Sequence, residues 1–223
     1  MLRLQVLWVL VATLASAMAV AAELEGDLQI TVNGKPLRSG EAQEAVIYFR
    51  PHTPVPLTPA AEPALLTTLR KQFVPHLLAV QAGESVRFPN QDVILHNAFS
   101  TSPTRPFDTG QYPHGDGQTF RFDQPGLVRV YCNVHHSMFG FILVLDTPYH
   151  TRADANGHFR LADLPKGEGD IVVFHDRAPP LRQRVVVGKI GALRLELELN
   201  QRKIPAHSNK FGKPYSRRSN AHY

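Results

Sequence analysis

Short runs of β-branched and aromatic residues, separated by Gly, Pro, Asn and Asp, recur along the chain after residue 22. No long stretch there has the 3.6-residue spacing of an amphipathic helix. Recurring short runs of this kind are typical of an all-β sandwich or barrel. We therefore predict strands at Asp27 to Val32, Ala45 to Arg50, Leu77 to Val80, Ser85 to Pro89, Ala98 to Thr101, Gln118 to Phe122, Leu127 to Cys132, Phe141 to Leu145, His158 to Leu161, Asp170 to His175, Arg182 to Val187 and Leu193 to Leu199.

The segments between these strands also carry signals. Asn33-Gly34 predicts a hairpin turn. Residues 51–63 contain five prolines and predict a stiff linker. Residues 102–117, rich in Pro, Gly and Asp, predict a long surface loop, and Ala64 to Lys71 predicts one short helix.

The first 22 residues have the pattern of an export signal. Arg3 provides a positive start, Leu4 to Val20 are almost all apolar, and small residues follow up to Ala22. The apolar run is short and ends in a small-residue cleavage pattern, which favours a signal peptide over a membrane anchor. We expect cleavage after Ala21 or Ala22, a periplasmic location, and no membrane span in the mature chain.

The formal charge of +5 is concentrated at the C-terminus. Residues 201–223 carry six basic residues and no acidic one, which leaves 17 basic and 19 acidic residues in 4–200. The folded part is thus close to neutral, and we expect no nucleic-acid partner. The tail has few apolar residues, which predicts a disordered solubilising segment; the alternative is a docking arm for an acidic partner or an anionic lipid surface.

Cys132 is the one cysteine of the chain. In an oxidising compartment an unpaired thiol is expected to form a mixed disulfide, to be buried and inert, or to bind a metal. Cys132 is followed by His135 and Met138, and His96 lies 36 residues before it. A thiolate, two imidazoles and a weak thioether are the ligands of a trigonal copper site with a long axial bond.

Three alternatives remain open for these ligands. Met138 can be a core residue, His96 can be a hydrogen-bonded core histidine, and His136 can replace His135 in a shifted register. The other histidines have no mutual ligand spacing and are expected to be surface or structural residues, although the loop of His114 could lie near the metal.

Cys-x-x-His-x-x-Met after an aromatic residue, with His96-Asn97 upstream, resembles the type 1 (blue) copper site of the cupredoxin family, of the amicyanin and plastocyanin kind and including methylamine-utilisation-like proteins. The resemblance spans about residues 72–147 and implies a cupredoxin Greek-key β-sandwich over 64–147. It implies that His96, Cys132 and His135 are equatorial ligands and Met138 the axial one. Asn97 resembles the asparagine that ties the two ligand loops together, with Asn133 meeting it from the cysteine side.

A second resemblance covers Thr151 to Arg177. Asp154, Gly157, Phe159 and the run Leu164-Pro-Lys-Gly167 are similar to the carboxypeptidase-regulatory-like family, which has a transthyretin-like β-sandwich. Residues 24–50 resemble the opening strands of that family. We therefore predict a second sandwich made of 24–50 and 148–200, with the cupredoxin inserted between them; the alternative assigns 24–50 to an enlarged cupredoxin.

The cupredoxin resemblance implies a carrier of single electrons with one copper ion and no enzymatic activity. Its expected partner is a periplasmic haem protein or dehydrogenase that docks transiently, and the chain is expected to be a monomer. The chain has no Gly-x-Ser-x-Gly or HExxH motif and no His-x-His pair of a multicopper oxidase. The alternative function is copper capture, sensing or delivery, or carbohydrate or protein binding by the second sandwich.

Overall fold

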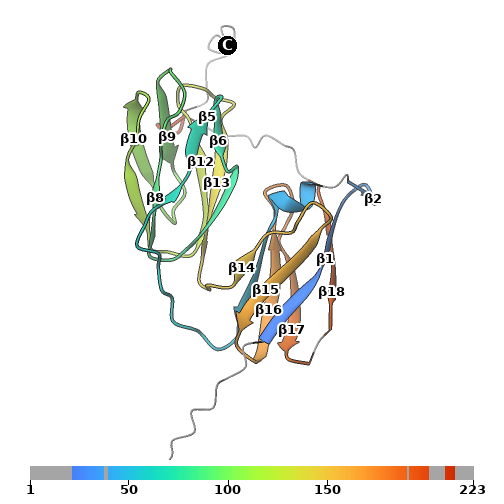
Figure 1. Cartoon of the computed structure of the whole chain (residues 1–223). Helices are drawn as coiled ribbons and strands as arrows, with labels where there is room; N and C mark the ends of the chain where they lie inside the picture. Colours follow the sequence, from blue (N-terminus) through green and yellow to red (C-terminus); the bar gives the residue numbers. More distant parts are fainter. Residues whose placement is uncertain (1–21, 38–39, 190, 201–208, 214–223) are drawn as a thin grey trace, which may run out of the picture.

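The computed structural model describes residues 22–37, 40–189, 191–200 and 209–213, and within them it is built almost entirely of β-strands (Figure 1). The one helical element of the described residues is a short 3-10 helix, η1 (Glu41–Glu44). The prediction of an all-β chain is confirmed. The predicted signal segment, apart from Ala22, lies outside the described residues, as does most of the basic tail. Among the residues described, no helix is long and apolar enough to cross a membrane.

Residues 64–145 form a β-sandwich that we call sandwich A. Its sheets have the strand orders β10-β9-β12-β13-β7 and β11-β8-β4, and β5 and β6 form a separate hairpin. The strands are β4 (Ala64–Leu65), β5 (Thr67–Leu69), β6 (Gln72–Val74), β7 (Leu77–Gln81), β8 (Glu84–Arg87), β9 (His96–Ser100), β10 (Phe107–Tyr112), β11 (Thr119–Phe122), β12 (Gly126–Tyr131) and β13 (Phe139–Leu145).

The sheets of sandwich A enclose one apolar core. Valine and phenylalanine side chains fill it, and the predicted metal ligands Cys132 and Met138 belong to the same cluster. β13 pairs antiparallel with β12 and parallel with β7, so it lies in the interior of its sheet.

Residues 22–51 and 150–198 form a second sandwich, sandwich B. Its sheets have the orders β15-β1-β18, with β2 on β1, and β14-β3-β16-β17. The strands are β1 (Ala22–Val32), β2 (Lys35–Pro36), β3 (Val46–Pro51), β14 (His150–Thr151), β15 (His158–Leu164), β16 (Gly167–Phe174), β17 (Leu181–Val187) and β18 (Leu193–Glu198).

Strands from both ends of the chain meet in sandwich B. β1 pairs with β15 and β18, and β3 pairs with β14 and β16, so strands that precede sandwich A in the sequence join strands that follow it. Leu24, Leu28 and Ile30 alternate with exposed residues along β1 and point into the core, as the period of two requires. Asn33 and Gly34 both have positive φ, 52° and 69°, in the turn from β1 to β2.

Two predictions of local structure were wrong. Residues 64–71 are extended, not helical, and Arg70 and Lys71 (φ 51° and 57°) form the tight turn of the β5–β6 hairpin. The predicted loop 102–117 contains β10, which pairs with β9. A bulge in β10, where Gly110 has a φ of 66°, interrupts the alternation of buried side chains and hides the strand in the sequence pattern.

The two sandwiches pack against each other through a third apolar cluster. Sandwich A contributes Leu77, Phe141, Leu143 and Leu145, and sandwich B contributes Val46 and Phe174. Arg50 of β3 adds an ion pair with Asp146, to whose carboxylate its Nε donates at 3.0 and 2.8 Å. β13 is therefore buried on both faces, which explains the unbroken apolar run over its second half.

Candidate metal centre

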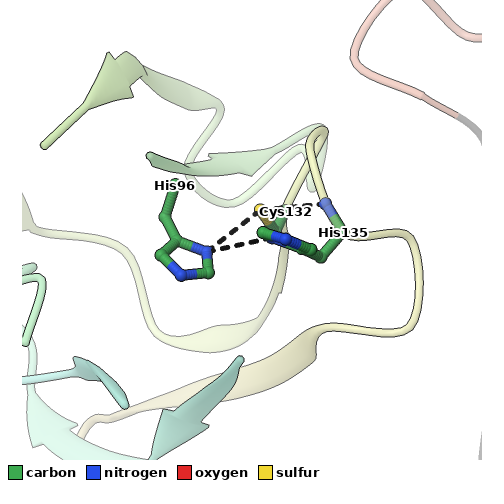
Figure 2. Close-up of side chains that lie close together, drawn as sticks. All are labelled: His96, Cys132 and His135. Atoms are coloured by element: carbon green, nitrogen blue, oxygen red, sulfur yellow. Dashed lines mark hydrogen bonds between the residues drawn. The ribbon is translucent and has the colours of Figure 1, made fainter. Parts of the chain in front are cut away.

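Three predicted ligands meet at one end of sandwich A. His96 is the first residue of β9, and Cys132 directly follows β12, which pairs with β9 at Tyr131 and Phe99. The chain then turns back, because Met138 N–H donates to the carbonyl of His135 at 3.0 Å and Cys132 N–H donates to the carbonyl of Met138 at 3.2 Å. This turn places His135 against Cys132 (Figure 2).

The ligand atoms are spaced for one metal ion. Nδ1 of His96 lies 3.2 Å from Nδ1 of His135 and 3.9 Å from Sγ of Cys132, and the three ligand atoms lie within 4.8 Å of one another. An ion bound at roughly 2.0 Å from nitrogen and 2.3 Å from sulfur in a trigonal plane separates its ligand atoms by about 3.5 to 3.7 Å. One thiolate and two imidazoles at these distances fit copper.

Burial sets the protonation of the donors. Desolvation lowers the pKa of His96 and of His135, so both imidazoles stay neutral and keep a lone pair for a metal. Burial also raises the pKa of the Cys132 thiol, and this effect outweighs the backbone N–H groups of His135, Asn97 and Val134 that favour the thiolate. Binding of a metal ion therefore has to displace the thiol proton.

Asp92 orients His96 from the side away from the other ligands. Its Oδ2 lies 2.9 Å from Nε2 of His96, and its two oxygens accept backbone N–H groups of Arg70 at 2.6 Å and Lys71 at 2.8 Å. Burial raises the pKa of Asp92, but these hydrogen bonds and His96 outweigh it, so the pKa lies below its usual value. A carboxylate in this position accepts a hydrogen bond from Nε2–H, which places the proton of the neutral imidazole on Nε2 and leaves Nδ1 as the ligand atom.

Asn97 links the strand of His96 to the cysteine loop. Its Oδ1 accepts the backbone N–H of Asn133 at 3.2 Å, and its Nδ2 donates to Asp108 at 2.7 Å and to the carbonyl of Gly110 at 3.0 Å. The side chain of Asn133 instead accepts the backbone N–H of Lys210 at 3.4 Å. Nζ of Lys210 pairs with Asp108 at 2.7 Å, so residues 209–213 of the predicted tail form a turn beside this loop.

Met138 is buried, with 1% of its surface exposed, and packs in the same core cluster as Cys132. Its backbone is hydrogen-bonded to both Cys132 and His135. Among the described residues, the cluster with metal-ligand spacing contains His135 and not His136. His114 is exposed and is no part of that cluster either.

Asp92 and Asp108 were not predicted as site residues. An acidic residue four positions before His96 is a weak signal outside a helix, because the loop geometry that brings the two together is set by Arg70 and Lys71 in a distant hairpin. Asp108 lies in the segment that was predicted as a loop.

No family model matches the chain, and no curated protein matches it. Three solved structures illustrate its likenesses, each over less than half of this chain. A Cu-containing nitrite reductase from Thermus scotoductus SA-01 is 28% identical over 42% of this chain, with a TM-score of 0.36, and the match spans only 25% of that enzyme. Amicyanin from Paracoccus versutus is 19% identical over 44% of this chain and 97% of its own, with a TM-score of 0.34. A purple cupredoxin from Nitrosopumilus maritimus is 21% identical over 36% and 96%, with a TM-score of 0.33.

Proposed function

We propose that this chain is an exported copper protein that carries single electrons. Sandwich A is its cupredoxin domain and holds one type 1 copper ion with His96, Cys132 and His135 as strong ligands and Met138 as the weak axial ligand. The observation that carries the proposal is the buried convergence of two imidazoles and the sulfur of Cys132 within 4.8 Å. Copper in such a site supplies a one-electron change between Cu(I) and Cu(II).

In this function the polypeptide holds the ligands in positions that suit both Cu(I) and Cu(II). His96 is held by Asp92, Cys132 by the backbone N–H of His135, and the two ligand segments by Asn97. Since these contacts do not pass through the metal, they hold the ligands in both oxidation states, and little rearrangement is needed when the ion gains or loses an electron.

The burial of the ligands argues against a site for catalysis or for metal delivery. His96 and Cys132 are fully buried and His135 is 6% exposed, so a substrate has no direct access to the ligand atoms. Delivery requires the metal to leave readily, and a preformed buried site opposes that.

An exposed apolar segment next to His96 supports transient docking. Val93, Ile94 and Leu95 are 96%, 38% and 49% exposed, and Leu95 directly precedes the ligand. An apolar surface close to a redox centre suits a short-lived complex with another redox protein. We assign to this role a periplasmic haem protein or dehydrogenase, in line with the predicted export signal.

Voltammetry of the copper-loaded protein, followed by incubation with a strong copper chelator, separates the two functions. A carrier gives a reversible one-electron couple and loses its copper slowly. An irreversible couple together with rapid loss of copper to the chelator would instead favour capture and delivery.

A further inference from the structure

A chain of polar side chains crosses from sandwich B to sandwich A near the metal centre. Oδ2 of Asp176, just after β16, lies 3.1 Å from Nε2 of His76, which directly precedes β7. Oδ1 of the same carboxylate lies 3.0 Å from Nδ1 of His175, whose Nε2 is 3.7 Å from Glu41. His175 is 2% exposed and the Asp176 side chain 9%, so the centre of this network is buried, while His76 and Glu41 at its two ends are partly exposed.

His76 in turn holds the segment that follows Met138. Its ring packs edge-on against Phe139 at 5.0 Å and Phe141 at 5.4 Å between ring centroids. Its carbonyl accepts the backbone N–H of Phe141 at 2.8 Å. The approach is close enough that a Cβ on Gly140 would lie 3.1 Å from that carbonyl oxygen. The position of Phe139, and with it that of the adjacent Met138, therefore depends on His76.

The segment has open space on another side. A cavity of about 480 Å³ between the sandwiches is lined by Ser137, Met138 and Phe139 as well as by His76 and Asp176. Close-packed atoms would fix the segment from every side, whereas atoms that line a cavity lack packing partners on that side. The contacts of His76 thus matter more here than in a filled core.

We propose that Asp176 of sandwich B is a positioning residue for the metal centre, acting through His76 and Phe139 on the thioether of Met138. This inference rests on the proposed function, because it concerns the axial ligand of the copper site assigned above. In this proposal sandwich B sets how strongly the thioether of Met138 contacts the metal in sandwich A. A weak axial ligand is one of the groups that tune the reduction potential of such a site.

The test is a double-mutant cycle of Asp176→Asn and His76→Phe, in which phenylalanine keeps an aromatic ring against Phe139. Asp146→Asn is the matched control, since it removes a carboxylate from the same contact between the sandwiches, where Asp146 pairs with Arg50. For each copper-loaded protein, the reduction potential and the electron paramagnetic resonance spectrum are measured. For each metal-free protein, the ¹H–¹³C signal of the Met138 ε-methyl group is recorded, which also shows whether the variant is folded.

Asp176→Asn should raise the reduction potential, because a looser axial contact and one fewer nearby negative charge both favour Cu(I). It should also change the spectrum and shift the Met138 methyl signal. These two changes should vanish when it is made in the His76→Phe background, whereas the part of the potential shift that comes from the lost charge should persist. Asp146→Asn should leave the spectrum and the methyl signal unchanged. The inference is overturned if Asp176→Asn matches Asp146→Asn in the spectrum and the methyl signal, or if its effects on these two readouts add fully to those of His76→Phe. A wild-type protein without a type 1 spectrum would defeat the proposed function itself, and the methyl signal of the metal-free protein would still test the contact.

Discussion

Nε2 of His96 lies 2.9 Å from Oδ2 of Asp92, and this contact fixes the orientation of the imidazole. Asp92 is held by two backbone N–H groups of the β5–β6 turn, so a hairpin remote in sequence determines the direction in which His96 presents Nδ1. A carboxylate that accepts the N–H of a metal-binding histidine raises the basicity of the other ring nitrogen. Asp92 stands in this relation to Nδ1 of His96.

Replacing Asp92 by Asn should weaken copper binding. The loss of the carboxylate removes the charge that orients the Nε2 proton of His96, and such changes cost about 10- to 100-fold in metal affinity. Competition titration against a chelator of known affinity measures the effect. Asp123→Asn serves as control, since the Asp123 carboxylate pairs with Arg121 on the exposed surface. Equal affinities for the two variants would show that Asp92 does not support the site.

Asn97→Ala should destabilise the metal-free protein by about 1–3 kcal/mol, because it leaves buried polar groups without their hydrogen bonds. Asn97 is 1% exposed and bonds to Asn133, Asp108 and Gly110. Urea unfolding gives the free energy of unfolding of the variant and of Asn156→Ala, an exposed asparagine. A change no larger than that of Asn156→Ala would contradict the linking role of Asn97.

Much of the fold was readable from the sequence because β1 and β18 of sandwich B alternate between buried and exposed residues and the turns carry their own signals. β1 shows both, with alternating Leu24, Leu28 and Ile30 and the Asn33-Gly34 turn. The proximity of Cys132 and His135 was also predictable, since the two residues lie three positions apart and need only one turn to meet. Metal binding by these residues remains a prediction.

The wrong predictions for residues 64–71 and 102–117 have causes that the local sequence pattern does not contain. The segment 64–71 is extended because β4 pairs with β8 and β5 with β6, contacts that a propensity reading does not include. The bulge at Gly110 interrupts the alternation of buried residues by which β10 could have been predicted. The link from Asp176 to His76 joins residues 100 positions apart, so no spacing rule points to it.

The stability of the protein should depend on Asp176 in acid. Burial raises the pKa of Asp176, but its contacts with His175 and His76 outweigh this, so the pKa in the folded state lies below the ordinary 3.8. The contribution of a group with a lowered pKa is complete above the unfolded-state value and is lost as the pH falls toward the folded-state value. Below about pH 4 the wild type should therefore lose stability more steeply than Asp176→Asn.

Urea unfolding at a series of pH values from neutral to acid compares the two proteins, with Asp116→Asn on an exposed loop as control. At neutral pH, Asp176→Asn should be the less stable protein, and the difference should shrink in acid. Parallel profiles would mean that the carboxylate of Asp176 is not stabilised by its neighbours.

The contact between the sandwiches should contribute strongly to stability. Phe174 is 8% exposed and packs with Leu77 and Phe141 of sandwich A. Phe174→Ala should cost about 3–5 kcal/mol, the usual range for a buried phenylalanine. Phe211, which is 73% exposed, provides the matched control, and Phe211→Ala should change the free energy of unfolding by less than about 0.5 kcal/mol. A loss below 1 kcal/mol for Phe174→Ala would indicate that the sandwiches are only loosely joined.

The visible absorption spectrum after addition of one equivalent of Cu(II) tests the central claim most directly. The account predicts an intense blue sulfur-to-copper charge-transfer band in the wild type and its absence in Cys132→Ser, which keeps both imidazoles but replaces the thiolate. A wild-type protein that binds copper without this band, or a variant that retains it, would contradict the assignment of Cys132, His96 and His135 as the ligands of a blue-copper centre.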